Sequence, residues 1–245
     1  MIPWLATHDP FPETRLALDA SSDAPGLLAA TPDLSIARLE MAYRRGIFPW
    51  FSPGQPVLWW STDPRMVLRT DQFKLSRSLR KTIEKFRRTP GCEIRIDSAF
   101  DKVIEACALT PRDGQSGSWI VPEMRWTYGE WHRAGRAHSF ETWVDGQLVG
   151  GLYGIAMGRM FFGESMFSRR TDASKLALAA LVAFCRAHDV PLIDCQQETS
   201  HLASLGASPI PRTDFETHLR GVVDAATPRD WTYDESFWSR LGLSA

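Results

Sequence analysis

Several features that mark large classes of protein are absent from this 245-residue sequence or scarce in it. Positive charge is not in excess, since the formal net charge is -1, so any affinity for nucleic acid has to come from a local basic patch. No apolar run reaches the ~18 residues of a membrane span, and residues 1–12 lack the basic and apolar regions of a secretory signal. We therefore expect a cytoplasmic protein with no membrane partner.

Cysteine pairs and histidine clusters are also missing. The four cysteines, Cys92, Cys107, Cys185 and Cys195, form no C-x-x-C pair and have no histidine neighbours at ligand spacing. This pattern argues against a zinc site. Scattered thiols without an export signal are typical of a reducing cytosol. We expect no metal site.

Tryptophan, in contrast, is abundant, with ten residues. Most of them are expected to pack in the core or on the surface, but ten are enough for some to serve as stacking platforms. Apolar residues make up 44% of the chain and charged residues 23%, as in ordinary globular proteins. The length suits one large domain or two unequal ones.

The chain is expected to divide near Asp63-Pro64-Arg65 into two domains. Residues 1–64 form the small N-terminal domain, with an irregular lead-in, a helix capped by Ser35 and ended by Gly46, and a short strand. Residues 65–245 form the larger domain.

A basic helix is predicted over residues 77–88. Leu79, Ile83 and Phe86 recur at spacings of three and four, so the helix has one buried face and one cationic face. A solvated charged face is the commoner explanation, but Glu84 is the only acid in the segment, which leaves few internal ion pairs. An anionic partner is therefore a fair inference. The cationic residues are Arg77, Arg80, Lys81, Lys85, Arg87 and Arg88.

From residue 93 on, the predicted order is strand, helix, helix, hairpin, strand, helix, strand, helix. Asp145-Gly146 marks the hairpin turn, residues 111–117 are expected to be a loop, and the long apolar helix ends near His188. This order predicts an α/β (α+β) fold with a mixed, largely antiparallel sheet and helices on both faces. The hairpin followed by strand, long helix and strand is similar to the GNAT acyltransferase core.

A single carboxylate, Glu164, lies in the apolar and aromatic run at 160–168. An ionised carboxylate is costly to bury without a partner, so its presence needs a reason. It is either a structural group, paired with Arg169 or Arg170 or capping a turn, or a site residue.

A second anomaly occurs in the buried strand predicted at 192–196. Side chains alternate along a strand, so Asp194 and Gln196 share one face with each other. Each also has a structural explanation, as a local cap and as a strand end. Two polar anomalies in one sheet favour a polar cleft that includes Glu164.

A set of motifs in a fixed order carries a resemblance to a known family. The motifs are Gly46-Ile47-Phe48-Pro49-Trp50-Phe51, Leu58-Trp59-Trp60-Ser61, Phe162-Gly163-Glu164-Ser165-Met166-Phe167-Ser168, Ala173-Ser174-Lys175, Leu192-Ile193-Asp194-Cys195-Gln196, Ser204-Leu205-Gly206-Ala207 and Ile210-Pro211-Arg212. Together they resemble bacterial leucyl/phenylalanyl-tRNA–protein transferases, from about Gly26 to about Leu219.

The resemblance implies an activity and a fold. Such enzymes move Leu or Phe, with Met as a further candidate, from aminoacyl-tRNA to the N-terminal amine of proteins that begin with Arg or Lys. The added residue marks the protein for N-degron proteolysis. The donor ester is already activated, so no ATP, metal or other cofactor is expected. The implied fold is a small N-terminal domain followed by a GNAT-like catalytic domain, and the chain is expected to be a monomer.

The resemblance also assigns residues to roles. Glu164, Asp194 and Gln196 correspond to the catalytic positions, and Trp50 and Trp119 to the pair that holds the terminal adenosine. The residues expected to line the aminoacyl pocket are Leu152, Phe161, Met166, Leu178, Leu181 and Ile193. The residues expected to contact the tRNA backbone are Arg77, Arg80, Lys81 and Lys85.

A carboxamide is too weakly basic to act as a general base. We therefore expect Asp194 to orient Gln196, whose carbonyl oxygen accepts a hydrogen bond from the attacking amine. Glu164 then holds the ammonium form or takes the proton.

Two other enzymes remain as alternatives. A CoA-dependent N-acetyltransferase needs a glycine-rich pyrophosphate loop before the long helix, and the segment at 169–174 contains no glycine. A peptidoglycan-type aminoacyl-tRNA transferase would share the donor but not the acceptor. An RNA-binding module leaves the three polar residues unexplained. One departure from the family pattern is Thr31-Pro32 where Gly-Gly is usual, so the turn there has to differ.

Overall fold

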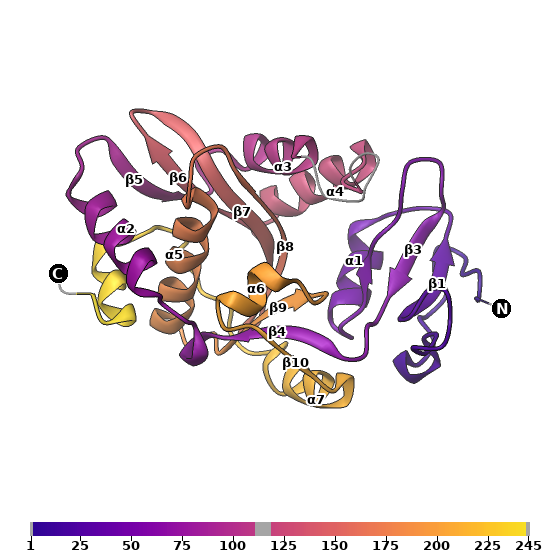
Figure 1. Cartoon of the computed structure of the whole chain (residues 1–245). Coiled ribbons are helices and arrows are strands. Elements are labelled where there is room, and N and C mark those ends of the chain that lie inside the picture. Colours follow the sequence, from indigo (N-terminus) through magenta and orange to yellow (C-terminus); the bar gives the residue numbers. More distant parts are fainter. Residues whose placement is uncertain (1, 111–118, 244–245) are drawn as a thin grey trace.

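A small antiparallel sheet and a large mixed sheet form the framework of the protein (Figure 1). The computed structural model describes residues 2–110 and 119–243, so the loop predicted over 111–117 lies outside the described residues. The small sheet has the order β1-β3-β2. The elements of this N-terminal part are η1 (Thr14–Leu16), β1 (Leu27–Thr31), α1 (Ile36–Tyr43), β2 (Phe48–Pro49) and β3 (Val57–Trp60).

The predicted ends of α1 are confirmed. The side chain of Ser35 accepts a hydrogen bond from the Arg38 amide, and Gly46 takes a φ of +71° just beyond the helix. Strand β1, in contrast, was not predicted within the lead-in. All five of its residues are buried, so the segment has no apolar–polar alternation to mark it.

The departure at Thr31-Pro32 has a structural counterpart. The Thr31 side chain is fully buried, accepts a hydrogen bond of 2.9 Å from Trp59 Nε1 and donates one of 2.9 Å to the Asp33 carbonyl. The threonine hydroxyl thus supplies the turn contacts at the end of β1.

The large sheet has the strand order β10-β4-β9-β8-β7-β6-β5. All its neighbouring pairs are antiparallel except β8 with β9, which is parallel. The predicted α/β class with a mixed, largely antiparallel sheet is confirmed. Its strands are β4 (Arg65–Arg69), β5 (Cys92–Ile96), β6 (Ala137–Val144), β7 (Gln147–Met157), β8 (Met160–Ser168), β9 (Leu192–Gln196) and β10 (Ser208–Ile210).

Helices cover both faces of this sheet (Figure 1). On one face, α5 (Ala173–Ala187) packs between α2 (Arg77–Arg88) and the 3₁₀ segment η3 (Glu235–Leu241), and η2 (Thr70–Gln72) lies beside it. On the other face lie α3 (Phe100–Leu109) and α4 (Pro122–Arg133). The remaining helices are α6 (Ser200–Ser204), part of which falls in a predicted loop, and α7 (Arg212–Val222).

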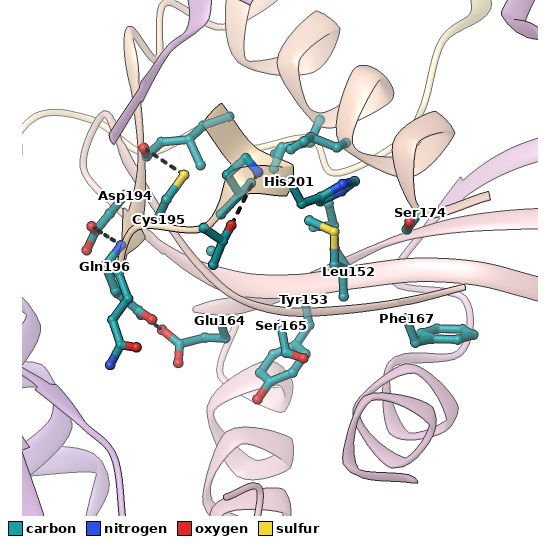
Figure 2. A pocket seen from close by; sticks show the side chains of 18 of the residues that line it. Leu152, Tyr153, Glu164, Ser165, Phe167, Ser174, Asp194, Cys195, Gln196 and His201 are labelled. Carbon is teal, nitrogen blue, oxygen red and sulfur yellow. Dashed lines mark hydrogen bonds between the residues drawn. The ribbon is translucent and has the colours of Figure 1, made fainter. Parts of the chain in front are cut away.

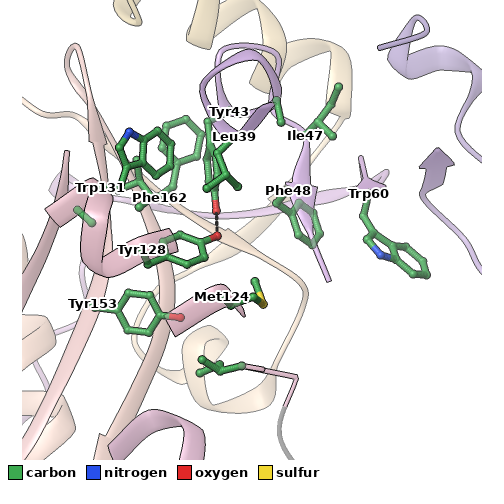
Figure 3. Packing of buried hydrophobic residues seen from close by; sticks show 14 of the residues in the cluster. Leu39, Tyr43, Ile47, Phe48, Trp60, Met124, Tyr128, Trp131, Tyr153 and Phe162 are labelled. Atoms are coloured by element: carbon green, nitrogen blue, oxygen red, sulfur yellow. Dashed lines mark hydrogen bonds between the residues drawn. The ribbon is translucent and has the colours of Figure 1, made fainter. Parts of the chain in front are cut away.

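The N-terminal unit packs against the large sheet through α1 (Figure 1). Tyr43 of α1 makes an edge contact with Phe162 of β8 at 5.1 Å and a tilted contact with Trp131 of α4 at 5.5 Å, measured between ring centroids (Figure 3). A single cluster of buried apolar residues extends from residue 5 through this contact to residue 223. The division at residues 64 and 65, between β3 and β4, remains a prediction. Helix α1 places the Tyr43 side chain in the interior, against Phe162 of the large sheet.

None of the helices in residues 2–110 and 119–243 combines the length and the apolar character needed to cross a membrane.

Candidate active site

A cavity of about 720 Å³ lies between residues 48–50, strands β7 to β9, and helices α5 and α6 (Figure 2). Its lining is mainly apolar. The polar lining residues include Glu164 and Gln196 near the ends of β8 and β9, and Ser168 and Ser174 around the start of α5. The sequence-predicted residues that line it are Trp50, Trp119, Leu152, Glu164, Met166, Leu178, Leu181, Ile193, Asp194 and Gln196.

Phe161 does not lie on the wall of this cavity. Its ring is 1% exposed and packs against Phe140 at 6.2 Å and Trp231 at 6.5 Å, in the core beneath α5. It supports the pocket from behind.

The cavity opens where two parallel strands part. Strands β8 and β9 pair only from Met160 with Leu192 to Phe162 with Asp194. Beyond that point β8 continues to Ser168 while β9 ends at Gln196. Beyond this split the backbone groups of the two strands no longer pair with each other. The next side chains of each strand meet at the mouth of the cavity.

Glu164 is held by three hydroxyl or amide donors at this split. Its carboxylate accepts hydrogen bonds from Tyr43 OH at 2.7 Å, Gln196 Nε2 at 2.9 Å and Tyr128 OH at 3.4 Å. The two tyrosine hydroxyls also lie 2.6 Å apart (Figure 3). Tyr43 comes from α1, so the small N-terminal unit contributes directly to the site.

Burial sets the protonation of this group. It raises the pKa of Glu164 to about 7, with the nearby charge of Asp194 adding to the rise and the hydrogen bonds from Tyr43, Gln196 and Tyr128 opposing it. Burial also raises the pKa values of Tyr43 and Tyr128, so both stay protonated donors. Glu164 is therefore poised to gain or lose a proton near neutral pH.

Asp194 is occupied by a buried arginine. Its Oδ1 and Oδ2 atoms accept hydrogen bonds from Arg65 Nε at 2.8 Å and Nη2 at 2.6 Å, and both side chains are at most 1% exposed. The Arg65 guanidinium lies 4.7 Å from the ring centroids of both Phe48 and Phe215. Such a bidentate pair engages both oxygens of the carboxylate with a buried counter-charge.

Asp194 orients Gln196 through the backbone. Its Oδ1 accepts the Gln196 amide N–H at 2.9 Å, and Gln196 takes a φ of +60° at the end of β9. This turn directs the Gln196 side chain toward Glu164. The carboxylate needs a donor, so the NH₂ group faces it and Oε1 is left to accept an N–H from a substrate.

Three residues of this network were not predicted from the sequence. Arg65 starts a run of apolar residues, so the reasoning that singled out Glu164 could have found it as a buried charge needing a partner. The sequence gives no comparable indication for Tyr43 and Tyr128, because a tyrosine on an apolar helix face looks like an ordinary core residue.

The basic helix α2 presents an exposed cationic stripe, formed by Arg77, Lys81, Lys85 and Arg88 at spacings of four, four and three. Arg80 is different, since it is half-buried and donates to the Gly242 carbonyl at 2.9 Å. The stripe thus contains three of the four residues predicted to contact the tRNA backbone. It also includes Arg88, which was not among those four.

The described residues include no group of three or more His, Cys, Asp or Glu side chains able to hold a metal ion. The one buried carboxylate pair, Glu164 and Asp194, is engaged by tyrosines, an amide and an arginine.

A carboxylate poised near neutral pH, an oriented amide and an apolar cavity at a split between parallel strands define an α/β enzyme of the acyltransferase type. Comparison with known sequences narrows this class. Residues 67–220 match the profile of the leucyl/phenylalanyl-tRNA protein transferase family, and residues 32–63 match the profile of its N-terminal domain. The chain belongs to the leucyl/phenylalanyl-tRNA–protein transferase family.

Relatives with that name cover almost the whole chain. The transferase of Leptothrix cholodnii is 68% identical, with 99% of this chain and 96% of the relative aligned. That of Methylibium petroleiphilum is 64% identical, with 98% and 91% aligned.

Solved structures give more distant likenesses. L-PGS from Bacillus licheniformis aligns with a TM-score of 0.38 and 11% identity over 72% of this chain and 57% of that chain. A GCN5-related N-acetyltransferase from Kribbella flavida aligns with a TM-score of 0.32 and 12% identity, over 73% and 61%.

Proposed function

We propose that this enzyme transfers Leu, Phe or Met from aminoacyl-tRNA to the N-terminal α-amine of proteins that begin with Arg or Lys. The observation that supports it most is the Glu164–Gln196 pair on the wall of a mainly apolar cavity. The product is a new peptide bond, and the added residue marks the acceptor for N-degron proteolysis. The reaction takes place in the cytosol and the enzyme acts as a monomer.

The Glu164–Gln196 pair suits an attacking amine. Gln196 Oε1 accepts one amine hydrogen and the Glu164 carboxylate accepts another, which aligns the nitrogen lone pair with the ester carbon. The nitrogen attacks, the C–O bond to the ribose breaks, and the proton lost by the amine passes to the ribose oxygen. With a pKa of about 7, Glu164 can accept this proton and release it within one cycle.

The apolar part of the cavity suits the donor side chain. Leu152, Leu178, Leu181 and Ile193 form its walls, and Met166 adds a flexible thioether. Such a lining accepts unbranched or γ-branched side chains of different lengths and discriminates by shape alone, which limits selectivity between Leu and Phe.

Two tryptophans suit the terminal adenosine. Trp50 and Trp119 both line the cavity and are half-buried, so each ring has a surface left to offer. Trp50 is also fixed from behind, because its carbonyl accepts Trp60 Nε1 at 2.7 Å and its ring lies 5.3 Å from that of Trp60. Fixed aromatic rings bind bases with little loss of entropy.

The test is a transfer assay with labelled Leu-tRNA and a protein that begins with Arg. Mass spectrometry should find Leu on the α-amine of this protein, and not on the same protein with an acetylated N-terminus. Parallel reactions offer acetyl-CoA as donor and a peptidoglycan precursor as acceptor. Label on the precursor, acetylation of the acceptor, or no product would each overturn the proposal.

A further inference from the structure

We propose that Arg170 and Lys175 form a phosphate-binding bridge between the mouth of the cavity and the cationic stripe of α2. On this view the bridge binds the backbone phosphates of the last nucleotides of the aminoacyl-tRNA. The inference rests on the proposed function and deepens it, because it states where the single-stranded end of the donor tRNA lies between the cavity and α2.

The bridge lies at one edge of the cavity. Ser168, the last residue of β8, and Ser174, in the first turn of α5, both line the cavity. Figure 2 shows Ser174 at this edge. The Ser168 hydroxyl donates to the Arg170 carbonyl at 2.7 Å, which holds the connecting segment in a tight turn. Arg170 and Lys175 thus flank the two serines of the cavity wall directly.

The same segment touches α2. Thr82 Oγ1 of α2 donates to Asp172 Oδ2 at 3.4 Å, and Lys85 lies one turn further along the same helix surface. A strand that leaves the cavity toward the cationic stripe therefore crosses the start of α5. Arg170 and Lys175 are the cations that it meets there.

Lys175 is fixed near the cavity. Its Nζ pairs with Asp172 Oδ1 at 2.9 Å, and the ammonium remains partly exposed. Burial lowers the pKa of His201, and the charge of Lys175 lowers it further. His201 lines the cavity from α6.

Arg170 is exposed at the other side of the segment. None of the ion pairs in residues 2–110 and 119–243 includes it. Arg170 lines a second cavity with Glu105 of α3 and Gly146 of the β6–β7 turn. Cys92 pairs with Val144 beside that turn, so Arg170 lies near the start of β5. Cys92 is itself hydrogen-bonded to the Thr89 carbonyl at the end of α2. Arg170 is therefore placed to continue the stripe toward the cavity.

A purely structural role is the competing explanation, since Lys175 and Asp172 could only stabilise the first turn of α5. The two roles differ in their dependence on donor length. Phosphate contacts act only on a donor that has phosphates, and each adds about 0.7 to the salt slope of binding to a single strand.

The experiment measures the dissociation constants of three donors with an amide-linked leucyl group, which resists hydrolysis. These are leucyl-adenosine, the leucyl trinucleotide CCA and full-length leucyl-tRNA. The variants are R170Q/K175Q, the α2 variant R77Q/K81Q/K85Q, and R159Q as control. Arg159 is an exposed arginine at the opposite end of β8.

R170Q/K175Q should bind leucyl-adenosine like the wild type, which also shows that the variant is folded. It should bind the trinucleotide and the tRNA about tenfold more weakly, with a salt slope lower by about 1.4 for the two lost contacts. The α2 variant should lose affinity for the tRNA only, and R159Q should lose none.

An unchanged trinucleotide affinity in R170Q/K175Q would overturn the bridge and leave the proposed function intact. An equal loss for leucyl-adenosine would also overturn it, because the effect would then not depend on phosphates. If the wild-type protein binds none of the three donors, the proposed function itself fails.

Discussion

Gln196 Nε2 and Glu164 Oε1 lie 2.9 Å apart, across the point where β9 and β8 separate. The contact fixes the amide of Gln196, so that its carbonyl oxygen and the carboxylate present two acceptors side by side. Two adjacent acceptors are what an α-amine needs to be oriented and relieved of a proton. The separation of β8 and β9 therefore positions the two acceptor groups of the site.

The hydroxyl of Tyr43 should set the acid limit of activity. Y43F removes a 2.7 Å hydrogen bond to the carboxylate, which raises the pKa of Glu164 above about 7. A hydrogen bond to a charged group contributes ~1.5 kcal/mol or more, so the acid limb of the rate profile should move up by about one pH unit. Profiles of wild type and variant with the same acceptor check this, since ionisation of the amine is common to both. Coincident acid limbs would contradict the role of Tyr43.

Burial of Glu164 should cost stability at high pH. Its pKa is near 7 in the folded state and 4.5 in the reference state, so the folded protein binds more protons between these values. Stability from this group is complete below pH 4.5 and is lost as the pH rises through 7, by ~3 kcal/mol in total. The free energy of unfolding of E164Q, measured by urea denaturation, should therefore rise relative to that of the wild type between pH 5 and pH 8. E198Q, on an exposed loop, controls for the loss of one negative charge, and an equal gain there would contradict the prediction.

The ion pair of Arg65 and Asp194 should show strong coupling. R65M leaves a buried carboxylate without its partner and should reduce the free energy of unfolding by ~3–5 kcal/mol. The double variant R65M/D194L removes both charges and should recover much of this loss, while losing activity because Gln196 is no longer oriented. Additive losses in the double-mutant cycle would show that the pair is not coupled.

Cavity size should tune the choice of donor. Leu178 is 3% exposed and lies on the apolar wall, so L178F fills space that a larger donor side chain would use. The ratio of kcat/KM for Phe-tRNA to that for Leu-tRNA should fall about tenfold or more, within the ~1–3 kcal/mol that such pockets discriminate. A loss of folded protein would lower both values equally and leave their ratio unchanged, so no separate folding control is needed. An unchanged ratio would place the donor side chain elsewhere.

Much of this architecture could be predicted because local signals agreed with the final structure. Ser35 caps the helix that it was expected to cap, and Asp145-Gly146 forms the turn of the β6–β7 hairpin. Strand β1 was missed because a strand buried on both faces lacks alternation.

The site was predictable where charge stood against an apolar background, as at Glu164 and Asp194. Period-two alternation implied that Asp194 and Gln196 share a face and an orientation. In the structure the left-handed backbone of Gln196 turns its side chain to Glu164, while Asp194 faces Arg65. Long-range partners such as Tyr43 depend on how the two sheets pack, which no local pattern specifies.

The most direct test compares wild-type protein with E164Q in single-turnover transfer of Leu from Leu-tRNA to a protein that begins with Arg. The account predicts that E164Q reduces the rate about 100-fold or more, as expected for loss of a proton acceptor. The dissociation constant for Leu-tRNA should stay the same, because Glu164 faces the acceptor amine. A transfer rate equal to that of the wild type would contradict the role of Glu164 at the centre of the site.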